Sequence, residues 1–311
     1  MHITLTTLTP LWTGGVDQTC DRLHETGLIG SLRWWYEVLV RGLDGYACDP
    51  TGEDRCPDKD GKRCVACELF GCTGWARKFR LQMLTTLRIE KNKNKVIAAG
   101  QSIKIAIIPL RSIDPEEWCL LNATFRLISE YGAIGGKTIF KPSDEKNRQN
   151  EFHHLDFGLA KIEFSEESPC HNLNLDKIRG YVTDRKWRSG NHKDYSWASL
   201  QHFWCVNGRY LARQDDQTST FNQVLGRKQP KRQGQSLVNQ SESSRWLAGS
   251  QQESKKVFSF KSPDKGRTFG FVKPGTVDFD EIKRRLGQVW SGFNPDKEFM
   301  TVKEVLGKIF I

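Results

Sequence analysis

Five of the nine cysteines crowd into one short segment, in the pattern Cys48-x7-Cys56-x7-Cys64-x2-Cys67-x4-Cys72. Zinc in structural sites takes four ligands in a tetrahedron, and a C-x-x-C turn supplies two of them. We predict a structural zinc site held by Cys48, Cys56, Cys64 and Cys67, with Cys72 in reserve. A site closed by four cysteines has no open coordination position, so it would support folding rather than catalysis. Loose surface thiols and a redox dithiol are the alternative interpretations.

A second group of residues suits anion binding. Gly27, Gly30 and Ser31 precede Arg33, and the apolar pattern predicts a helix over 29–43 with Arg33 in its first turn. Backbone N–H groups at a helix start favour a phosphate, and an arginine adds a bidentate donor. The alternative is that the glycines only shape a turn and that Arg33 is solvated.

A glycine-rich stretch at 132–136 follows another predicted helix and is continued by Lys137. Glycines permit backbone to approach an anion closely, and Lys137 and Lys141 supply positive charge. The stretch is not a nucleotide-binding P-loop, because no glycine lies five residues before Gly136. A helix C-cap followed by a turn is the alternative interpretation.

Basic and aromatic residues are interleaved at 75–80, a segment that contains Arg77 and Lys78. Such a segment could follow a nucleic-acid strand by charge and stacking, although a solvated face is the simpler interpretation. Of two adjacent tryptophans, Trp35 fits the apolar stripe of the helix and is expected in the core. No paired carboxylates and no Ser–His–Asp pattern stand out, and His24 is the one histidine beside a glycine segment that could act as a general base.

The amino-acid composition indicates which kind of molecule the protein binds. The chain has 311 residues, a formal net charge of +10 and a pI of about 9.1, which favours polyanionic partners. No signal peptide and no apolar run long enough for a membrane span is visible, so an intracellular protein is expected. In a reducing compartment a cysteine cluster indicates metal binding rather than disulfides.

The elements expected to position these residues belong to the α+β class. A strand, a helix, two strands and a helix are predicted over 2–9, 29–43, 79–90, 102–110 and 115–130. This is the order of the first five elements of a ferredoxin-like unit. A second unit is expected to open with a strand at 155–164. Its further elements are a helix at 175–186, a strand at 197–206, a long polar loop at 213–245, a hairpin at 257–273 and a helix at 278–290.

Three motifs, in this order, resemble one known family. They are Thr9-Pro10-Leu11-Trp12-Thr13-Gly14-Gly15, Gly27-Leu28-Ile29-Gly30-Ser31-Leu32-Arg33-Trp34-Trp35-Tyr36-Glu37 and Cys64-x-x-Cys67-Glu68-Leu69-Phe70-Gly71. The sequence resembles the RAMP superfamily of CRISPR proteins, and more narrowly the first-named RAMP subunit of the type III-B (Cmr) effector complex. The stretch at 132–136 is similar to the glycine-rich loop of that family, although Lys137–Pro142 departs from its usual continuation.

The resemblance implies a fold of two ferredoxin-like (RRM-like) modules. The domains would be 1–140, with the zinc insert at 46–72, and 141–311, with the polar loop at 213–245. It implies a non-catalytic cytoplasmic subunit near the 3′ end of the guide, because target cleavage belongs to another subunit. The partners would be guide CRISPR RNA, single-stranded target RNA and other RAMP subunits.

On this hypothesis RNA would contact two backbone segments and several side chains. Arg33 with Gly30 and Ser31 would hold one phosphate stretch, and Lys137 with Gly135 and Gly136 another. The further candidates are Arg22, Trp12, Arg77 and Lys78. A guide-RNA-processing, metal-independent endoribonuclease that uses His24 is the alternative function, and a zinc-bearing scaffold that binds only protein is the third.

Overall fold

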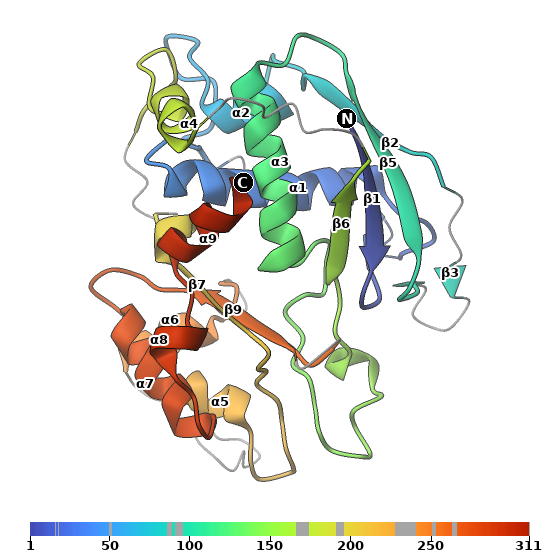
Figure 1. Ribbon diagram of the computed structural model, residues 1–311, viewed down its shortest axis with the longest axis vertical. Coiled ribbons are helices and arrows are strands. Elements are labelled where there is room, and N and C mark those ends of the chain that lie inside the picture. The colour runs from blue at the N-terminus through green and yellow to red at the C-terminus, as the bar shows by residue number, and fades with distance from the viewer. Residues whose placement is uncertain are drawn as a thin grey trace.

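The computed structural model describes residues 1–15, 17, 19–49, 52–85, 89–90, 96–165, 174–190, 196–227, 241–250, 253–262 and 266–310. Two antiparallel sheets dominate these residues, and the first lies above the second in Figure 1. The α+β class expected from the sequence is confirmed. No helix among the described residues is both long enough and apolar enough to cross a membrane.

The first sheet has four strands in the order β2-β5-β1-β6, and each neighbouring pair is antiparallel. The strands are β1 (His2–Thr7), β2 (Phe79–Met83), β5 (Ser102–Pro109) and β6 (Ala160–Phe164). Ile103, Ile105 and Ile107 of β5 are all buried, as expected for a sheet with one covered face. The apolar face of this sheet therefore forms one side of the hydrophobic core.

Strand β6 corrects one expectation. The sequence predicts that a strand at 155–164 opens a second unit, but β6 pairs with β1 and places Ile162 opposite Leu5. The alternation of apolar residues in β6 would suit either sheet, so the local pattern could not choose between them. A short pair, β3 (Ile89–Glu90) and β4 (Val96–Ile97), stands apart from the first sheet. The polar tip predicted at 91–95 lies outside the described residues.

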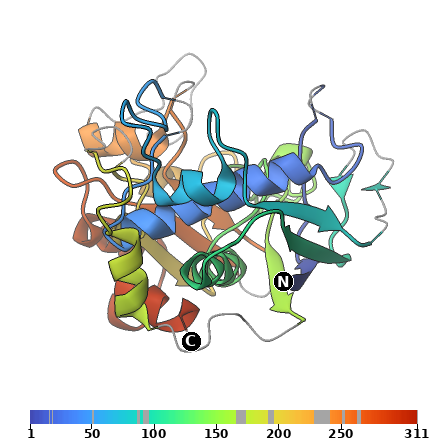
Figure 2. The ribbon, with the colours of Figure 1, turned by 90° about the horizontal axis from the view of Figure 1, so that it is seen from above.

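Helices α1 (Glu25–Gly42) and α3 (Pro115–Glu130) pack together against the apolar face of the first sheet. Figure 2 shows α1 as the long blue helix that crosses the molecule. Helix α3 covers the predicted range because strong local signals fix its start. Pro115 occupies the first turn, and the Asp114 backbone N–H donates to Glu117 Oε2 at 2.9 Å in a capping box.

Helix α1 begins earlier than its apolar pattern indicated. It starts at Glu25 instead of residue 29, and His24 at the N-cap makes no side-chain capping hydrogen bond. Because no capping residue marks this start, the sequence alone placed it too late. Gly30, Ser31 and Arg33 therefore lie inside the helix, where their backbone N–H groups are not at the helix start. The phosphate site predicted from the first turn is wrong in this respect.

The second sheet has three strands in the order β7-β9-β8. They are β7 (Phe203–Asn207), β8 (Val257–Phe260) and β9 (Arg267–Phe271). β8 and β9 pair as the predicted hairpin, whose connection at 263–265 lies outside the described residues. On the other edge of β7, Cys205 forms an isolated antiparallel bridge with Met300. The second sheet is therefore extended beyond β7 by one bridge, at Met300.

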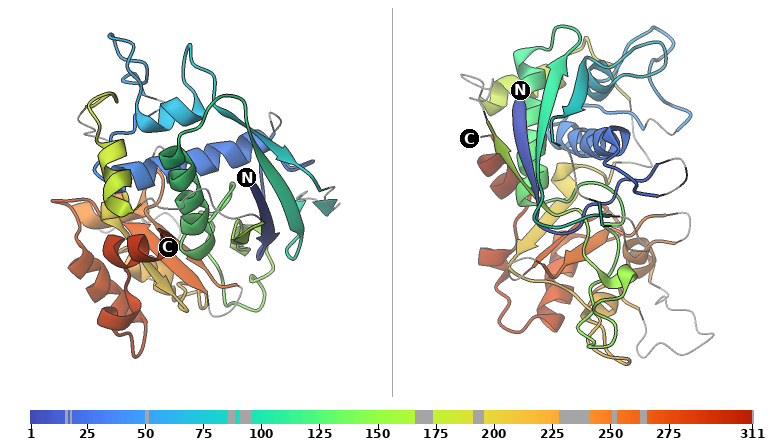
Figure 3. Two further views of the ribbon diagram at one scale, coloured as in Figure 1. Left: turned by 45° about the horizontal axis from the view of Figure 1, so that its top comes forward. Right: turned by 90° about the vertical axis from the view of Figure 1, so that its right-hand side faces the viewer.

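Most of the remaining helices are short. They are α2 (Val65–Phe70), α4 (Leu175–Val182), α5 (Thr220–Val224), α6 (Glu242–Ala248), α7 (Phe279–Val289), α8 (Pro295–Glu298) and α9 (Val302–Ile309), with 3-10 turns at Phe152–His154 and Leu200–His202. Helices α4 and α9 pack against α3, and Figure 3 shows the orange and red helices of the C-terminal half near the second sheet.

The polar loop expected at 213–245 is partly helical. Helix α5 and the first residues of α6 fall in this range, and each is capped by a serine, Ser219 or Ser241, that accepts a backbone N–H. Phe221 and Trp246 are buried and anchor the two helices. Because the segment is mostly polar, the serine caps and the two anchoring aromatic residues did not stand out in the sequence. Residues 228–240 lie outside the described residues.

Helix α1 joins the two sheets through aromatic side chains. The Trp35 ring centroid lies 5.9 Å from that of Phe203 and 5.7 Å from that of Phe269, and Trp34 lies 5.7 Å from Phe271. These edge-to-face contacts are the favoured geometry for aromatic pairs. The buried apolar residues of both halves form one continuous core, so the sheets are not separate folding units.

Arg267 makes a second connection between the halves. From β9 its guanidinium donates to Gly132 O at 2.8 Å and to Ser129 O at 2.9 Å, at the C-terminal end of α3. The last carbonyl groups of a helix lack partners within the helix and carry the negative end of its dipole. A cation from the second sheet therefore stabilises a helix that covers the first.

A buried ion pair fixes the start of β2 against α3. The Lys78 ammonium lies 2.9 and 3.0 Å from the two carboxylate oxygens of Glu117 and 3.1 Å from Glu68. Lys78 is 7 % exposed and Glu117 is fully buried. Removing one partner of a buried pair leaves an uncompensated charge, so this pair is a strong constraint on the fold.

We expect the substitution Lys78→Met to lower the free energy of unfolding by about 3–5 kcal/mol, because Glu117 would stay buried without its cation. Urea denaturation measures this change. Arg80→Met is the matched control, since Arg80 is a nearby exposed cation, and it should shift stability by no more than about 0.5 kcal/mol. Equal effects of the two substitutions would show that the buried pair is not needed.

Candidate nucleic-acid interface and metal centre

A groove of about 630 Å³ lies along α1, between the first-sheet segments and the second sheet. Both glycine segments predicted to bind an anion meet in it. It is lined by Trp12, Thr13, Gly14, Gly27, Gly30, Ser31, Arg33, Trp34, Trp35, Glu37, Arg41, Asp49, Ala133, Gly135, Gly136, Thr138, Ile139, Trp197, Ser254, Phe258 and Phe269. The set includes six of the ten residues that the sequence analysis assigned to RNA.

The two glycine segments touch directly. The Ser31 hydroxyl oxygen accepts a hydrogen bond from the Gly135 backbone N–H at 3.2 Å, and the Gly136 N–H donates to Trp12 O at 2.8 Å. These amides are thus already used within the protein. The glycine stretch shapes the groove wall rather than offering free N–H groups to a phosphate.

Close packing explains why glycine occupies these positions. Gly135 has a φ of +84°, and a Cβ there would lie 2.7 Å from the Trp12 carbonyl oxygen. A Cβ on Gly136 would lie 2.5 Å from the Trp12 ring. Both distances are too short for real atoms, so any larger residue would push the Trp12 segment away. By contrast, a Cβ on Gly30 would meet nothing within 4 Å, which leaves the groove open at that point.

Aromatic rings dominate the groove walls. Trp12 and Trp34 come from the N-terminal half, while Trp197, Phe258 and Phe269 come from the C-terminal half. Trp34, Trp197 and Phe258 are half-buried and keep part of their ring surface open. The three C-terminal residues were missed in the sequence, because no local signal showed which face of β8 and β9 would meet α1. Such rings suit the stacking of nucleic-acid bases.

Lys137 stands beside one end of the groove. Its backbone has a φ of +62°, and its ammonium lies 4.6 Å from the centroid of the Trp12 ring and 5.0 Å from that of Phe152. A cation over an aromatic face is held by the ring quadrupole. Lys137 therefore places positive charge close to the Trp12 wall without lining the groove itself.

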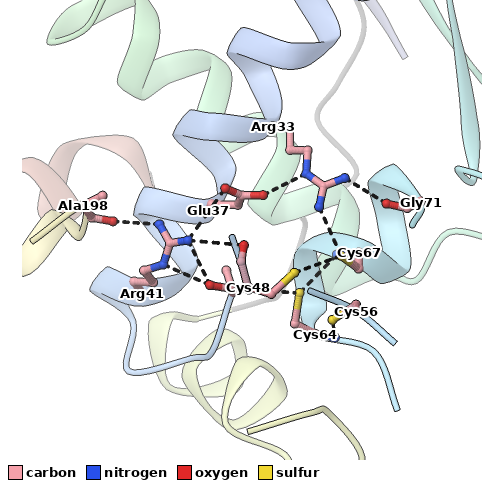
Figure 4. A network of polar contacts seen from close by, with 10 residues as sticks. Arg33, Glu37, Arg41, Cys48, Cys56, Cys64, Cys67, Gly71 and Ala198 are labelled. Carbon is pink, nitrogen blue, oxygen red and sulfur yellow. Dashed lines mark hydrogen bonds and ion pairs between the residues drawn. The ribbon is translucent and has the colours of Figure 1, made fainter. Parts of the chain in front are cut away.

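Three charged residues follow one face of α1 where it passes the cysteines (Figure 4). Arg33 Nε donates to Glu37 Oε1 at 2.8 Å, and Arg41 Nη2 lies 3.7 Å from the other carboxylate oxygen of Glu37. Burial raises the pKa of the Glu37 carboxyl above its ordinary value, although both guanidiniums act to lower it. The one carboxylate offsets part of the positive charge of the two guanidiniums.

The donors of Arg33 are directed away from solvent. Besides Glu37, its guanidinium donates to Gly71 O at 2.8 Å and to Cys67 Sγ at 3.1 Å. Burial acts to lower the pKa of Arg33, but the Glu37 carboxylate and the Cys67 sulfur raise it above the ordinary arginine value. Arg33 thus lines the groove, while its guanidinium contacts the cysteine cluster.

Cys48, Cys56, Cys64 and Cys67 come together as predicted. All four are buried, and their Sγ atoms lie within 4.8 Å of one another. Cys64 caps the short helix α2 and accepts from the Cys67 backbone N–H at 3.4 Å. Zinc–sulfur bonds of about 2.3 Å in a tetrahedron separate the sulfurs by roughly 3.8 Å, so the four thiols fit a zinc ion.

The surroundings of the cluster also suit an anionic metal site. Arg33 donates to Cys67, and Arg188 Nη1 approaches Cys56 Sγ at 3.7 Å. Cationic donors to thiolates offset the negative charge of a site with four cysteines. Cys72, the reserve ligand, is half-buried and lies outside the cluster, with its sulfur directed at Thr73 O at 3.8 Å.

The other predicted RNA contacts lie away from the groove lining. Arg22 is exposed, Arg77 is half-buried, and Lys78 is engaged with Glu68 and Glu117. No histidine belongs to the groove lining among the described residues. His24 instead lies 2.9 Å from Asp21 through Nε2 and has 13 % of its side chain exposed. The groove walls therefore offer no imidazole for proton transfer.

Among solved structures, the chain is similar to "Cmr1 from Pyrococcus furiosus (apo form)", a crystal structure, with 10 % identity, a TM-score of 0.47 and coverage of 89 % of each chain. It is also similar to a chain of the type III-B Cmr-beta complex bound to cognate target RNA and AMPPnP in the presence of ssDNA. That chain is 11 % identical, with a TM-score of 0.42 and coverage of 100 % of this chain and 99 % of that one.

A further Cmr-beta structure, bound to cognate target RNA, gives 10 % identity, a TM-score of 0.41 and the same coverage. No curated protein sequence matches the chain. The family model described as the RAMP superfamily matches residues 4–140, which contain α1, the cysteine cluster and the glycine stretch. The N-terminal part of this chain, residues 4–140, is therefore similar to the RAMP superfamily.

Proposed function

We propose that this chain is a non-catalytic RNA-binding subunit of a type III-B CRISPR ribonucleoprotein effector. The observation that carries the proposal is the aromatic groove in which both glycine segments of the RAMP-superfamily part meet the second sheet. A formal net charge of +10 favours a polyanionic partner. The partners would be guide CRISPR RNA, single-stranded target RNA and other RAMP subunits, in the cytoplasm and near the 3′ end of the guide.

The order of elements supports two ferredoxin-like modules, which is the fold proposed for such a subunit. Residues 2–164 carry strand, helix, strand, strand, helix and strand, and the fourth strand, β6, pairs with the first. In the second half β7, α6, β8, β9 and α7 repeat the series, and the bridge at Met300 takes the place of the fourth strand. On this interpretation the first module extends to β6, beyond residue 140.

The groove would bind RNA chiefly through its bases. The guanidiniums of Arg33 and Arg41 are committed to Glu37, to backbone carbonyls and to Cys67, and the carboxylates of Glu37 and Asp49 would repel a phosphate. The half-buried rings of Trp34, Trp197 and Phe258 offer surfaces on which bases stack without sequence preference. Phosphates would then remain at the rim, where Lys137 stands.

We expect Trp34→Ala to weaken the binding of a labelled single-stranded RNA by about 1–3 kcal/mol, the usual contribution of one base stacked on an aromatic ring. Fluorescence anisotropy measures the affinity. Trp118→Ala, which removes a half-buried tryptophan outside the groove, is the matched control and should bind as the unchanged protein does. Wild-type affinity in Trp34→Ala would remove this ring from the RNA site.

The alternative, a guide-RNA-processing ribonuclease, would depend on His24 as general base. His24 is paired with Asp21 and stands outside the groove lining. We expect labelled single-stranded RNA to shift on a native gel and to remain intact on a denaturing gel run from the same tube. Specific cleavage that is lost in His24→Ala would instead establish the processing enzyme and contradict a non-catalytic role.

We propose further that the cysteine cluster holds one structural zinc ion. Cys48, Cys56, Cys64 and Cys67 would bind it, and the ion would fold the insert at 46–72 against α1 through the Arg33–Cys67 contact. A zinc ion held by four thiolates stabilises the fold and leaves no position for a reacting group. The groove residues would bind RNA without direct help from the metal.

Elemental analysis of protein purified without added zinc should find about one equivalent per chain. Cys64→Ser should lose the metal and lower the melting temperature, because one of four ligands is gone. Cys72→Ser is the matched control, since Cys72 stands outside the cluster, and it should keep both. A folded wild-type protein without metal would contradict the zinc site.

A further inference from the structure

One cation, Lys255, stands at the end of the groove formed by Ile139 and Ser254. Lys255 follows Ser254 in the chain, and its ammonium donates to the backbone carbonyl of Ile139; both residues line the groove. Arg227 lies in the same region, because its backbone N–H donates to Asn222 O at 2.9 Å, next to Phe221, and the Lys255 ammonium lies 5.2 Å from the centroid of the Phe221 ring. The two positive charges repel each other. Arg227 and Lys255 are called the cationic pair below.

The cationic pair differs from the cations that are paired with carboxylates. Lys78 is paired with Glu117, and Arg33 with Glu37. In the described residues neither member of the cationic pair has a carboxylate partner: the Arg227 guanidinium reaches only Ala248 O, at 3.3 Å, and Lys255 reaches only Ile139 O. Among the described residues, the buried Arg227 Nε has no hydrogen-bond partner.

Buried donors without partners are costly, and two like charges side by side add repulsion. Burial, reinforced by Arg227, lowers the pKa of the Lys255 ammonium to about 8. Lys141 adds positive charge nearby, because its ammonium and that of Lys255 each lie 5.2 Å from the centroid of the Phe221 ring. An anion at this point would gain hydrogen bonds from both groups and relieve their repulsion.

The position of the cationic pair indicates which anion it takes. The walls of the groove are aromatic and suit bases, and the pair stands at its edge, where the backbone of a strand with its bases inside would pass. We propose that Arg227 and Lys255 together hold one backbone phosphate of a single-stranded RNA whose bases occupy the groove. This assignment rests on the proposed RNA-binding function and adds a phosphate site that the second half of the chain supplies.

The test measures the affinity of a labelled single-stranded RNA as a function of salt concentration. Lys255→Met and Arg227→Met should each weaken binding about tenfold or more, the effect of losing one charge-assisted hydrogen bond. Each phosphate neutralised contributes about 0.7 to the slope of log affinity against log salt for a single strand. Because the two cations share one phosphate, the slope should fall in each variant by up to that amount.

Lys303→Met is the matched control, because it removes one exposed positive charge on α9. It should leave both the affinity and the salt slope unchanged. Lys255→Met should also keep or raise the melting temperature, since no carboxylate loses a partner. A loss of binding in a variant that remains as stable as wild type separates the phosphate contact from a structural role.

The outcomes distinguish the inference from the proposed function. Wild-type protein that binds RNA, together with variants that keep its affinity and its salt slope, would overturn the phosphate site and leave the RNA-binding function intact. Wild-type protein that binds no single-stranded RNA would overturn both.

Discussion

Helix α1 carries Arg33, Glu37 and Arg41 into the interior, where Glu37 and Arg41 are buried and the Arg33 side chain is only 16 % exposed. Such a row of charges can be buried only where each member finds a partner, because an unpaired ion in the interior costs several kcal/mol. Glu37 forms ion pairs with both arginines. The remaining donors of Arg33 reach Gly71 O and Cys67 Sγ, and those of Arg41 reach Ala47 O and Ala198 O. The cysteine insert and the C-terminal half must therefore both close around α1.

The groove follows from this arrangement. One side of α1 is committed to the first sheet, and its charged row to the insert, so Trp34 and Trp35 meet the aromatic face of the second sheet. Near Gly30 the two sheets leave space over the helix, because a Cβ added there would meet no described atom within 4 Å. The aromatic character of the groove is thus a by-product of the way in which the two halves are held together.

Elements with strong local signals could be predicted from the sequence. The Asp114–Pro115–Glu117 cap gave the bounds of α3, and the spacing of the cysteines identified the four that converge. The start of α1 could not be placed, because His24 offers no capping bond. Lys78 looked like one more cation in a basic run, and only contact with Glu117, 39 residues away, shows that it is buried.

The sequence predicted some of the residues that line the groove and missed others. Trp12, Gly30, Ser31, Gly135 and Gly136 lie in the part that resembles a known family, and they do converge. Their predicted role, free amides toward a phosphate, does not fit the hydrogen bonds that they make with one another. Trp197, Phe258 and Phe269 were missed because the pairing of sheet and helix that exposes them is set by contacts distant in sequence.

The cap that Arg267 places on α3 has a consequence for synthesis on the ribosome. The guanidinium reaches a carbonyl 135 residues earlier in the chain, and translation at about 5–20 residues per second separates the two by roughly ten seconds. During that interval α3 ends in uncovered carbonyl groups, and one wall of the groove does not yet exist. A nascent chain therefore cannot present the full groove until the second sheet has been synthesised.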